Sequence, residues 1–148
     1  MGGPAVKITA DTNILVRAAV RDHAAQASVA EAILREAEII AVPLPALCEF
    51  VWVLARGYKR EAAEIAQAIR LLISSETVRT DRAAVEAGLR FLEAGGDFAD
   101  GVIAFDGRRL GGETFVSFDR AAVDIEARFG GATLLATIGP NNGGPIPT

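Results

Sequence analysis

The spacing of apolar residues at the start of the chain predicts a strand followed at once by a helix. Apolar and polar side chains alternate over residues 6–10, as they do in a half-buried strand. From Asp11 onward the apolar residues Ile14, Leu15 and Ala18 follow a helical spacing instead. The chain is therefore expected to change from strand to helix at a carboxylate.

The same succession of strand and helix patterns continues along the rest of the chain. We predict further strands at 39–42, 77–80, 114–118 and 132–136, and helices at 26–37, 45–56, 60–73, 82–93 and from Asp97 onward. Strands that alternate with helices are typical of an α/β fold with a mainly parallel sheet. At 148 residues the chain has the length of one domain. We expect that domain over residues 1–138 and a flexible tail, rich in Gly, Pro and Asn, at 139–148.

Composition narrows the chemistry that the chain can perform. A single cysteine, Cys48, and a single histidine, His23, exclude an internal disulfide and make the usual zinc sites improbable. Any metal ion is then expected to be held by oxygen atoms, which favours magnesium or manganese. The chain has neither an apolar run of about 20 residues nor the features of a signal peptide, so we expect a cytoplasmic protein without membrane contact.

Two aspartates directly follow predicted strands. Asp11 ends the first strand and Asp119 ends the strand at 114–118. Ligands of open α/β folds bind in the crevice at the carboxyl ends of the parallel strands, where both side chains are expected. Aspartate is also a preferred cap at the start of a helix, so for Asp11 the local sequence leaves a structural and a chemical role open.

Three further acids fall at the starts of predicted helices or within them. Glu49 is the one carboxylate in an otherwise apolar helix, and it must face water, pair with a cation or become protonated. Its side chain is expected either at the solvent or at the crevice edge. Asp97 and Asp100 are expected on one side of the first turn of their helix, either as a capping arrangement or as two carboxylates at the positive end of the helix dipole.

Carboxylates gathered at one edge of a sheet need cations or protons, because two like charges 4 Å apart repel by about 4 kcal/mol at a typical effective dielectric. Magnesium is commonly held by one or two carboxylates, water and substrate phosphates, and two such ions support hydrolysis of a phosphodiester. The acids therefore predict metal-dependent cleavage of a nucleic acid strand. The net charge of −4 argues against a broad basic surface for nucleic acid, although setting aside Asp11, Glu49, Asp100 and Asp119 leaves the rest of the chain without net charge.

Four motifs in this order resemble the PIN-domain ribonucleases, in particular the VapC-type toxins of toxin–antitoxin pairs. They are Asp11-Thr12-Asn13 after the first strand, Glu49 in a helix, Asp97-Phe98-Ala99-Asp100 at a helix start, and Ser117-Phe118-Asp119 at the end of a late strand. The resemblance implies a three-layer α/β/α domain with a central, mainly parallel sheet, and a magnesium- or manganese-dependent endoribonuclease.

The resemblance also implies roles for individual residues. Asp11, Glu49, Asp100 and Asp119 would be the catalytic and metal-binding acids. Asp97 would be either a fifth metal-binding acid or a group that supports the metal ligands, and Asn13 and Ser117 would hydrogen-bond the carboxylates or metal-bound water. It further implies an RNA substrate, a homodimer and a small antitoxin protein that covers the acidic groove. Gly101 departs from the family, which commonly has alanine after the third acid.

Other classes fit the sequence less well. A haloacid-dehalogenase enzyme needs a second aspartate where this chain has Asn13, and no phosphate-binding loop follows a strand. The serious alternative is a catalytically weak PIN-like module that binds RNA or protein. As a hypothesis, Lys59, Arg60, Arg108, Arg109 and Arg120 steer RNA toward the acids, although most of them are equally explained as solvated surface charges.

Overall fold

The computed structural model of the protein describes residues 6–138, and every strand pair within them is parallel. One sheet has the order β1-β2-β3, formed by Lys7–Thr9, Ile39–Ala41 and Val78–Arg79. The second sheet pairs β4 with β5, which are Thr114–Ser117 and Ala132–Leu135. The parallel α/β class expected from the sequence is thus confirmed, with the strands of residues 6–138 divided between two sheets.

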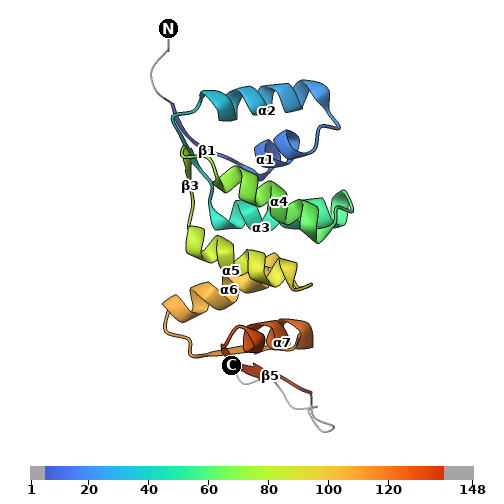
Figure 1. The fold of residues 1–148 in the computed structure, drawn as a ribbon, viewed down its shortest axis with the longest axis vertical. Helices are drawn as coiled ribbons and strands as arrows, with labels where there is room; N and C mark the ends of the chain where they lie inside the picture. Colours follow the sequence, from blue (N-terminus) through green and yellow to red (C-terminus); the bar gives the residue numbers. More distant parts are fainter. Residues whose placement is uncertain (1–5, 139–148) are drawn as a thin grey trace, which may run out of the picture.

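The helices stack along the long axis of the molecule (Figure 1). Their order along the chain is α1 (Thr12–Ala19), α2 (Ala24–Glu36), α3 (Leu44–Trp52), a π-helix (Val53–Gly57), α4 (Ala62–Ile73), α5 (Arg82–Glu93), α6 (Phe98–Arg109) and α7 (Arg120–Arg128). In Figure 1, α1 to α4 accompany the first sheet, α7 accompanies the second, and α5 and α6 lie between them.

Most predicted elements are present with similar bounds, one differs in kind and one begins earlier than predicted. The helix predicted at 45–56 is α3 followed by the π-helix, in which the amide N–H of Tyr58 bonds the carbonyl of Val53. The helix predicted from residue 26 begins at Ala24, because the Nδ1 of His23 caps it by accepting from the N–H of Gln26 at 3.2 Å. The tail predicted at 139–148 lies outside the described residues.

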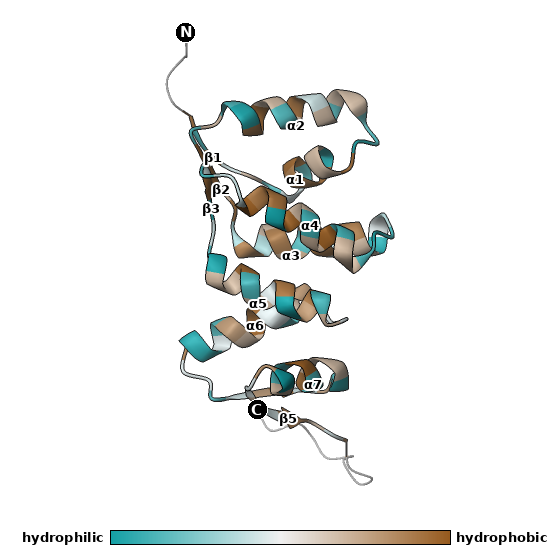
Figure 2. Ribbon diagram, viewed as in Figure 1, coloured by the Kyte–Doolittle hydropathy of each residue, from teal (hydrophilic) through white to brown (hydrophobic). Residues whose placement is uncertain are grey.

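Two clusters of buried side chains hold the fold together. The larger one joins α1, α3, α4, α5 and the first sheet, and Figure 2 shows the hydrophobic residues of α3 and α4 in its middle. Its most deeply buried side chains include Leu47, Ile65, Ile69, Leu89 and Phe98. The smaller cluster lies between α5, α6 and α7 and consists of Phe91, Ala104, Ala122 and Ile125. The contact between α6 and α7 therefore rests on little apolar surface.

Each of α5, α6 and α7 ends at a Gly-Gly pair. The first glycine of each pair, Gly95, Gly111 and Gly130, has a positive φ. The second glycine donates its N–H to a carbonyl five residues earlier, from Gly96 to Phe91 at 2.8 Å, from Gly112 to Gly107 at 2.8 Å and from Gly131 to Glu126 at 3.0 Å. These are Schellman motifs, and they stop each helix so abruptly that the next element begins within two residues.

Helices α5 and α6 touch through backbone atoms. A Cβ atom at Gly101 of α6 would lie 2.4 Å from the carbonyl oxygen of Ala87 and 2.9 Å from the Cα of Gly88, both on α5. Only glycine fits at this crossing. The chain's departure from the usual alanine after the third acid therefore has a packing reason.

Candidate active site

Asp11 stands at the junction of β1 and α1, as expected from the change of pattern. It is the N-cap of α1, and its Oδ1 accepts a hydrogen bond from the N–H of Thr12 at 2.8 Å. Its side chain remains exposed to solvent. The capping role is thus present, and it leaves carboxylate surface open to a ligand.

Glu49 is joined to the start of α1 by a hydroxyl group that the sequence analysis overlooked. The Oγ1 of Thr12 donates to the Oε2 of Glu49 at 2.9 Å, across 37 residues of chain. Thr12 is buried with 7% of its surface exposed, whereas Glu49 is exposed. Glu49 therefore faces solvent and, at the same time, lies at the edge where Asp11 begins α1. The only sequence signal for Thr12 was its place directly after Asp11.

The other three acids gather where α6 and α7 begin. Asp97 caps α6 by accepting from the N–H of Ala99 at 3.1 Å. Asp119 caps α7 by accepting from the N–H groups of Ala121 at 2.9 Å and Ala122 at 3.4 Å. We refer to Asp97, Asp100 and Asp119 as the α6–α7 acidic group.

Negative charge accumulates in this group. The pKa of Asp100 is raised above its ordinary value, first by burial of its carboxyl group and then by the charges of Asp97 and Asp119. The two caps are themselves held at helix N-termini, where the helix dipole favours negative charge. A cation bound here would relieve the repulsion that Asp100 experiences.

Cys48 lies on α3, the helix that carries Glu49, and it senses charges on the α6 segment. Its thiol is half-buried, and its pKa is raised by burial and then by the charges of Asp97 and Asp106 on the α6 segment. Helix α3, which carries both Cys48 and Glu49, is in contact with α6. The expectation that Cys48 is a small core residue agrees with its packing against the larger cluster.

The donor chemistry of the α6–α7 acidic group fits a hard divalent cation, because every side-chain donor in it is a carboxylate oxygen. Among residues 6–138, no three His, Cys, Asp or Glu side chains lie close enough together to hold one metal ion between them. Magnesium commonly takes one or two carboxylates and completes its shell with water and substrate phosphates. The α6–α7 acidic group therefore fits a magnesium ion by the type and the charge of its donor atoms.

Of the two residues expected to hydrogen-bond the acids, Ser117 bonds the backbone of Asp119, whereas Asn13 lines a groove between α1 and α2. The Oγ of Ser117 accepts from the backbone N–H of Asp119 at 3.0 Å, which fixes the turn that leads from β4 to α7. Asn13 is exposed and lines a groove between α1 and α2 together with Arg17, Gln26 and Val29. Within residues 6–138, the Glu49 carboxylate accepts its side-chain hydrogen bond from Thr12 rather than from Asn13.

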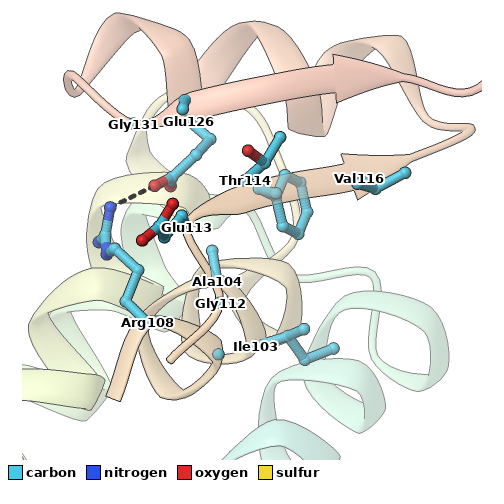
Figure 3. A pocket seen from close by; sticks show the side chains of 12 residues that line it. Ile103, Ala104, Arg108, Gly112, Glu113, Thr114, Val116, Glu126 and Gly131 are labelled. Atoms are coloured by element: carbon cyan, nitrogen blue, oxygen red, sulfur yellow. Dashed lines mark hydrogen bonds and ion pairs between the residues drawn. The ribbon is translucent and has the colours of Figure 1, made fainter. Parts of the chain in front are cut away.

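The arginines assigned to RNA steering are already paired within the chain. Arg108 bonds Glu126 at 2.5 Å, and Arg109 bonds Asp81 and lies over the ring of Phe105, 4.3 Å from its centroid. The Arg109 hydrogen bond is the main reason that the pKa of Asp81 is lowered. Arg108 lines a pocket of about 170 Å³ between α6, β4 and β5 (Figure 3). We therefore do not retain Arg108 and Arg109 as steering residues.

A family comparison agrees with this arrangement. The family model of the PIN domain matches residues 8–127, so the chain belongs to the PIN-domain family. No curated protein matches the chain. The membership confirms the predicted three-layer α/β/α class. PIN domains are usually metal-dependent nucleases, which supports a nuclease-like function and a nucleic acid partner. Within residues 6–138 no helix is both long and apolar enough to cross a membrane.

Proposed function

We propose that this PIN domain is a metal-dependent endoribonuclease that hydrolyses RNA phosphodiester bonds. Asp11, Glu49, Asp100 and Asp119 are the proposed catalytic acids. The family match supports the nuclease class, and two arrangements support these residues in particular. Thr12 links Asp11 to Glu49, and Asp100 and Asp119 lie close enough for their charges to interact.

The observation that carries the proposal is the crowding of carboxylates where α6 and α7 begin. Burial and like charge both disfavour the ionised form of Asp100, so this arrangement costs free energy in the isolated protein. Proteins retain such costs mainly at functional sites, where perturbed titration is common. A bound divalent cation turns the same charges into a favourable interaction.

The proposed cofactor is Mg²⁺ or Mn²⁺, which would take one or two carboxylates at a time from a set of five and complete its shell with water and substrate phosphate. The five are Asp97, Asp100 and Asp119 of the α6–α7 acidic group, together with Asp11 and Glu49. When bound, the ion would polarise the scissile phosphate and activate water for attack. The chain's own contribution is to hold the acids in place. Thr12 restrains the Glu49 carboxylate, and Ser117 fixes the turn that presents Asp119.

The biological setting forms a second part of the proposal. By its likeness to VapC-type proteins, the chain would be the toxin of a toxin–antitoxin pair, a homodimer in the cytoplasm, with a small antitoxin covering the acidic groove. This part rests on the motifs and is independent of the nuclease test. Co-expression with the product of an adjacent short gene, followed by size-exclusion chromatography, tests both the complex and the dimer.

The nuclease proposal is tested with the purified, partner-free chain and a pool of structured RNA. We expect cleavage with Mn²⁺ or Mg²⁺, none with a chelator, and none with Asp100→Asn or Asp119→Asn. Asp124→Asn is the matched control, because Asp124 is an exposed aspartate of α7 outside the acidic group. Cleavage by Asp100→Asn would show that the assignment is wrong.

The alternative is a catalytically weak PIN-like module that binds RNA or a protein. The restraint of Asp11 and Asp119 by their own helices is equally compatible with a module that only binds. RNA binding without turnover in either metal, by a folded chain free of any antitoxin, would favour this alternative. Turnover that depends on Asp100 would exclude it.

A further inference from the structure

The most buried charged side chain in residues 6–138 is outside the acidic site. Glu126 of α7 is only 4% exposed. A buried carboxylate costs several kcal/mol unless it is paired and hydrogen-bonded. The Nη1 of Arg108, on the last turn of α6, donates to the Oε1 of Glu126 at 2.5 Å, as the dashed line in Figure 3 shows. The pair thus connects two neighbouring helices.

The chain makes room for this pair with a glycine. A Cβ atom at Gly131 would lie 2.2 Å from the Oε1 of Glu126 and 2.7 Å from its Cγ. Gly131 reaches that place because the Schellman motif at the end of α7 folds it back, with its N–H on the carbonyl of Glu126. The motif that ends α7 therefore also leaves the space that the Glu126 carboxylate occupies.

The pair also lies at a particular end of the two helices. Arg108 and Glu126 are near the C-terminal ends of α6 and α7, while Asp100 and Asp119 interact at the N-terminal ends. The two helices consequently run in the same direction. They attract each other at one end through the ion pair and repel each other at the other end through the carboxylates.

The direct apolar contact between α6 and α7 is small, although both helices also pack against α5. Their shared apolar contact comes mainly from the small side chains Ala104 and Ala122, supported by Phe91 and Ile125. Asp100 and Arg108 are eight residues apart on α6, which is about 12 Å along the helix. Both residues belong to one continuous helix, so the contact that α6 makes with α7 at Arg108 bears on how the two helix starts lie against each other.

We propose that Arg108 and Glu126 are positioning residues, which hold α6 against α7 and thereby keep Asp100 and Asp119 within reach of one divalent cation. The inference rests on the proposed metal-dependent function. Neither residue needs to contact RNA or metal. The alternative is that the pair only stabilises the fold, in which case its loss lowers the melting temperature and leaves the metal affinity of the folded protein unchanged.

Mn²⁺ alone, titrated into the full chain and followed by electron paramagnetic resonance, separates these roles without an activity assay. Glu126→Gln and Arg108→Gln are each expected to weaken Mn²⁺ binding by about threefold to thirtyfold, the range for residues that act on a site through packed helices without contacting the ligand. The double variant is expected to lose no more than either single variant, because the two residues act as a unit. Glu93→Gln is the matched control, since it removes the exposed Arg70–Glu93 pair of 2.5 Å, which joins α4 to α5.

The outcomes distinguish the inference from the function on which it rests. Unchanged Mn²⁺ affinity in Glu126→Gln, together with lost binding in Asp100→Asn, overturns the positioning role and leaves the nuclease proposal standing. A wild-type chain that neither binds Mn²⁺ nor cleaves RNA overturns both. If Glu126→Gln does not fold, Gly131→Ala displaces the carboxylate while keeping its charge, and unchanged affinity in that variant likewise overturns the inference.

Discussion

Replacing Gly101 by alanine tests the contact that sets the position of the third acid. The new Cβ would lie 2.4 Å from the carbonyl oxygen of Ala87, where an ordinary van der Waals contact is 3.4 Å or more. The obstructing atoms belong to the backbone of α5, so no side chain can turn aside. Helix α6 must then move away from α5 by about 1 Å, with its first turn and the Asp100 carboxylate.

The cost to stability has two opposing parts. Overpacking against backbone costs about 1–3 kcal/mol, and alanine recovers about 1 kcal/mol of helix propensity relative to glycine. Because the backbone cannot yield, we expect a net loss near 2 kcal/mol. For a chain of this size that loss lowers the melting temperature by about 4–8 °C.

The same helix supplies the control. A Cβ at Gly107 meets no atom within 4 Å, so Gly107→Ala gains helix propensity without a clash. We expect it to be more stable than the wild type by about 0.5–1 kcal/mol. The two substitutions are chemically identical, lie in one helix and have opposite expected signs.

Thermal unfolding followed by circular dichroism measures both variants, and RNA cleavage measures the consequence for the site. A 1 Å displacement of catalytic groups can cost about 100-fold in rate, so we expect a loss of that order in Gly101→Ala and none in Gly107→Ala. If Gly101→Ala melts at or above the wild-type temperature, the close crossing of α5 and α6 does not exist and this account of the position of Asp100 is wrong.

Three further substitutions test other parts of the structure. Thr12→Val removes the hydroxyl group that bonds Glu49, and it is expected to lower the free energy of unfolding by about 0.5–1.5 kcal/mol. Unfolding in guanidinium chloride measures this loss, and Thr12→Ser, which keeps the hydroxyl group, should recover it. Asp100→Asn should raise the melting temperature near neutral pH and not at pH 3. Because the pKa of Asp100 is raised in the folded protein, its carboxyl group lowers stability as the pH rises from the ordinary aspartate pKa through the raised value, and has no such effect below both. Asp81 has a lowered pKa, so its pairing with Arg109 stabilises the folded protein above the ordinary aspartate pKa and is lost as the pH falls through the lowered value. In Asp81→Asn, the free energy of unfolding should therefore fall less steeply as the pH drops below about 4. An unchanged pH dependence would contradict the pairing of Asp81 with Arg109.

Local sequence patterns determined the elements and the places of the acids. The change of period at Asp11, the cap at Asp97 and the strand that ends before Asp119 all depend on interactions within a few residues. The structure places Asp11 and Asp97 at the helix starts that their patterns predicted, and it places Asp119 at the start of α7, a helix that was not predicted. The Gly-Gly pairs likewise end their helices through bonds that span five residues. The metal and catalytic roles of these acids stay predictions until the RNA and Mn²⁺ experiments are done.

Tertiary structure decided which residues meet across the chain. Thr12 reaches Glu49 over 37 residues and Arg108 reaches Glu126 over 18, and no periodicity distinguishes those partners from other threonines or arginines. The division of the strands into two sheets and the close crossing at Gly101 also follow from how whole helices pack. Short-range hydrogen bonds and the helical repeat are encoded locally, whereas the pairing of distant groups is chosen by the burial of apolar surface, which only the folded chain reveals.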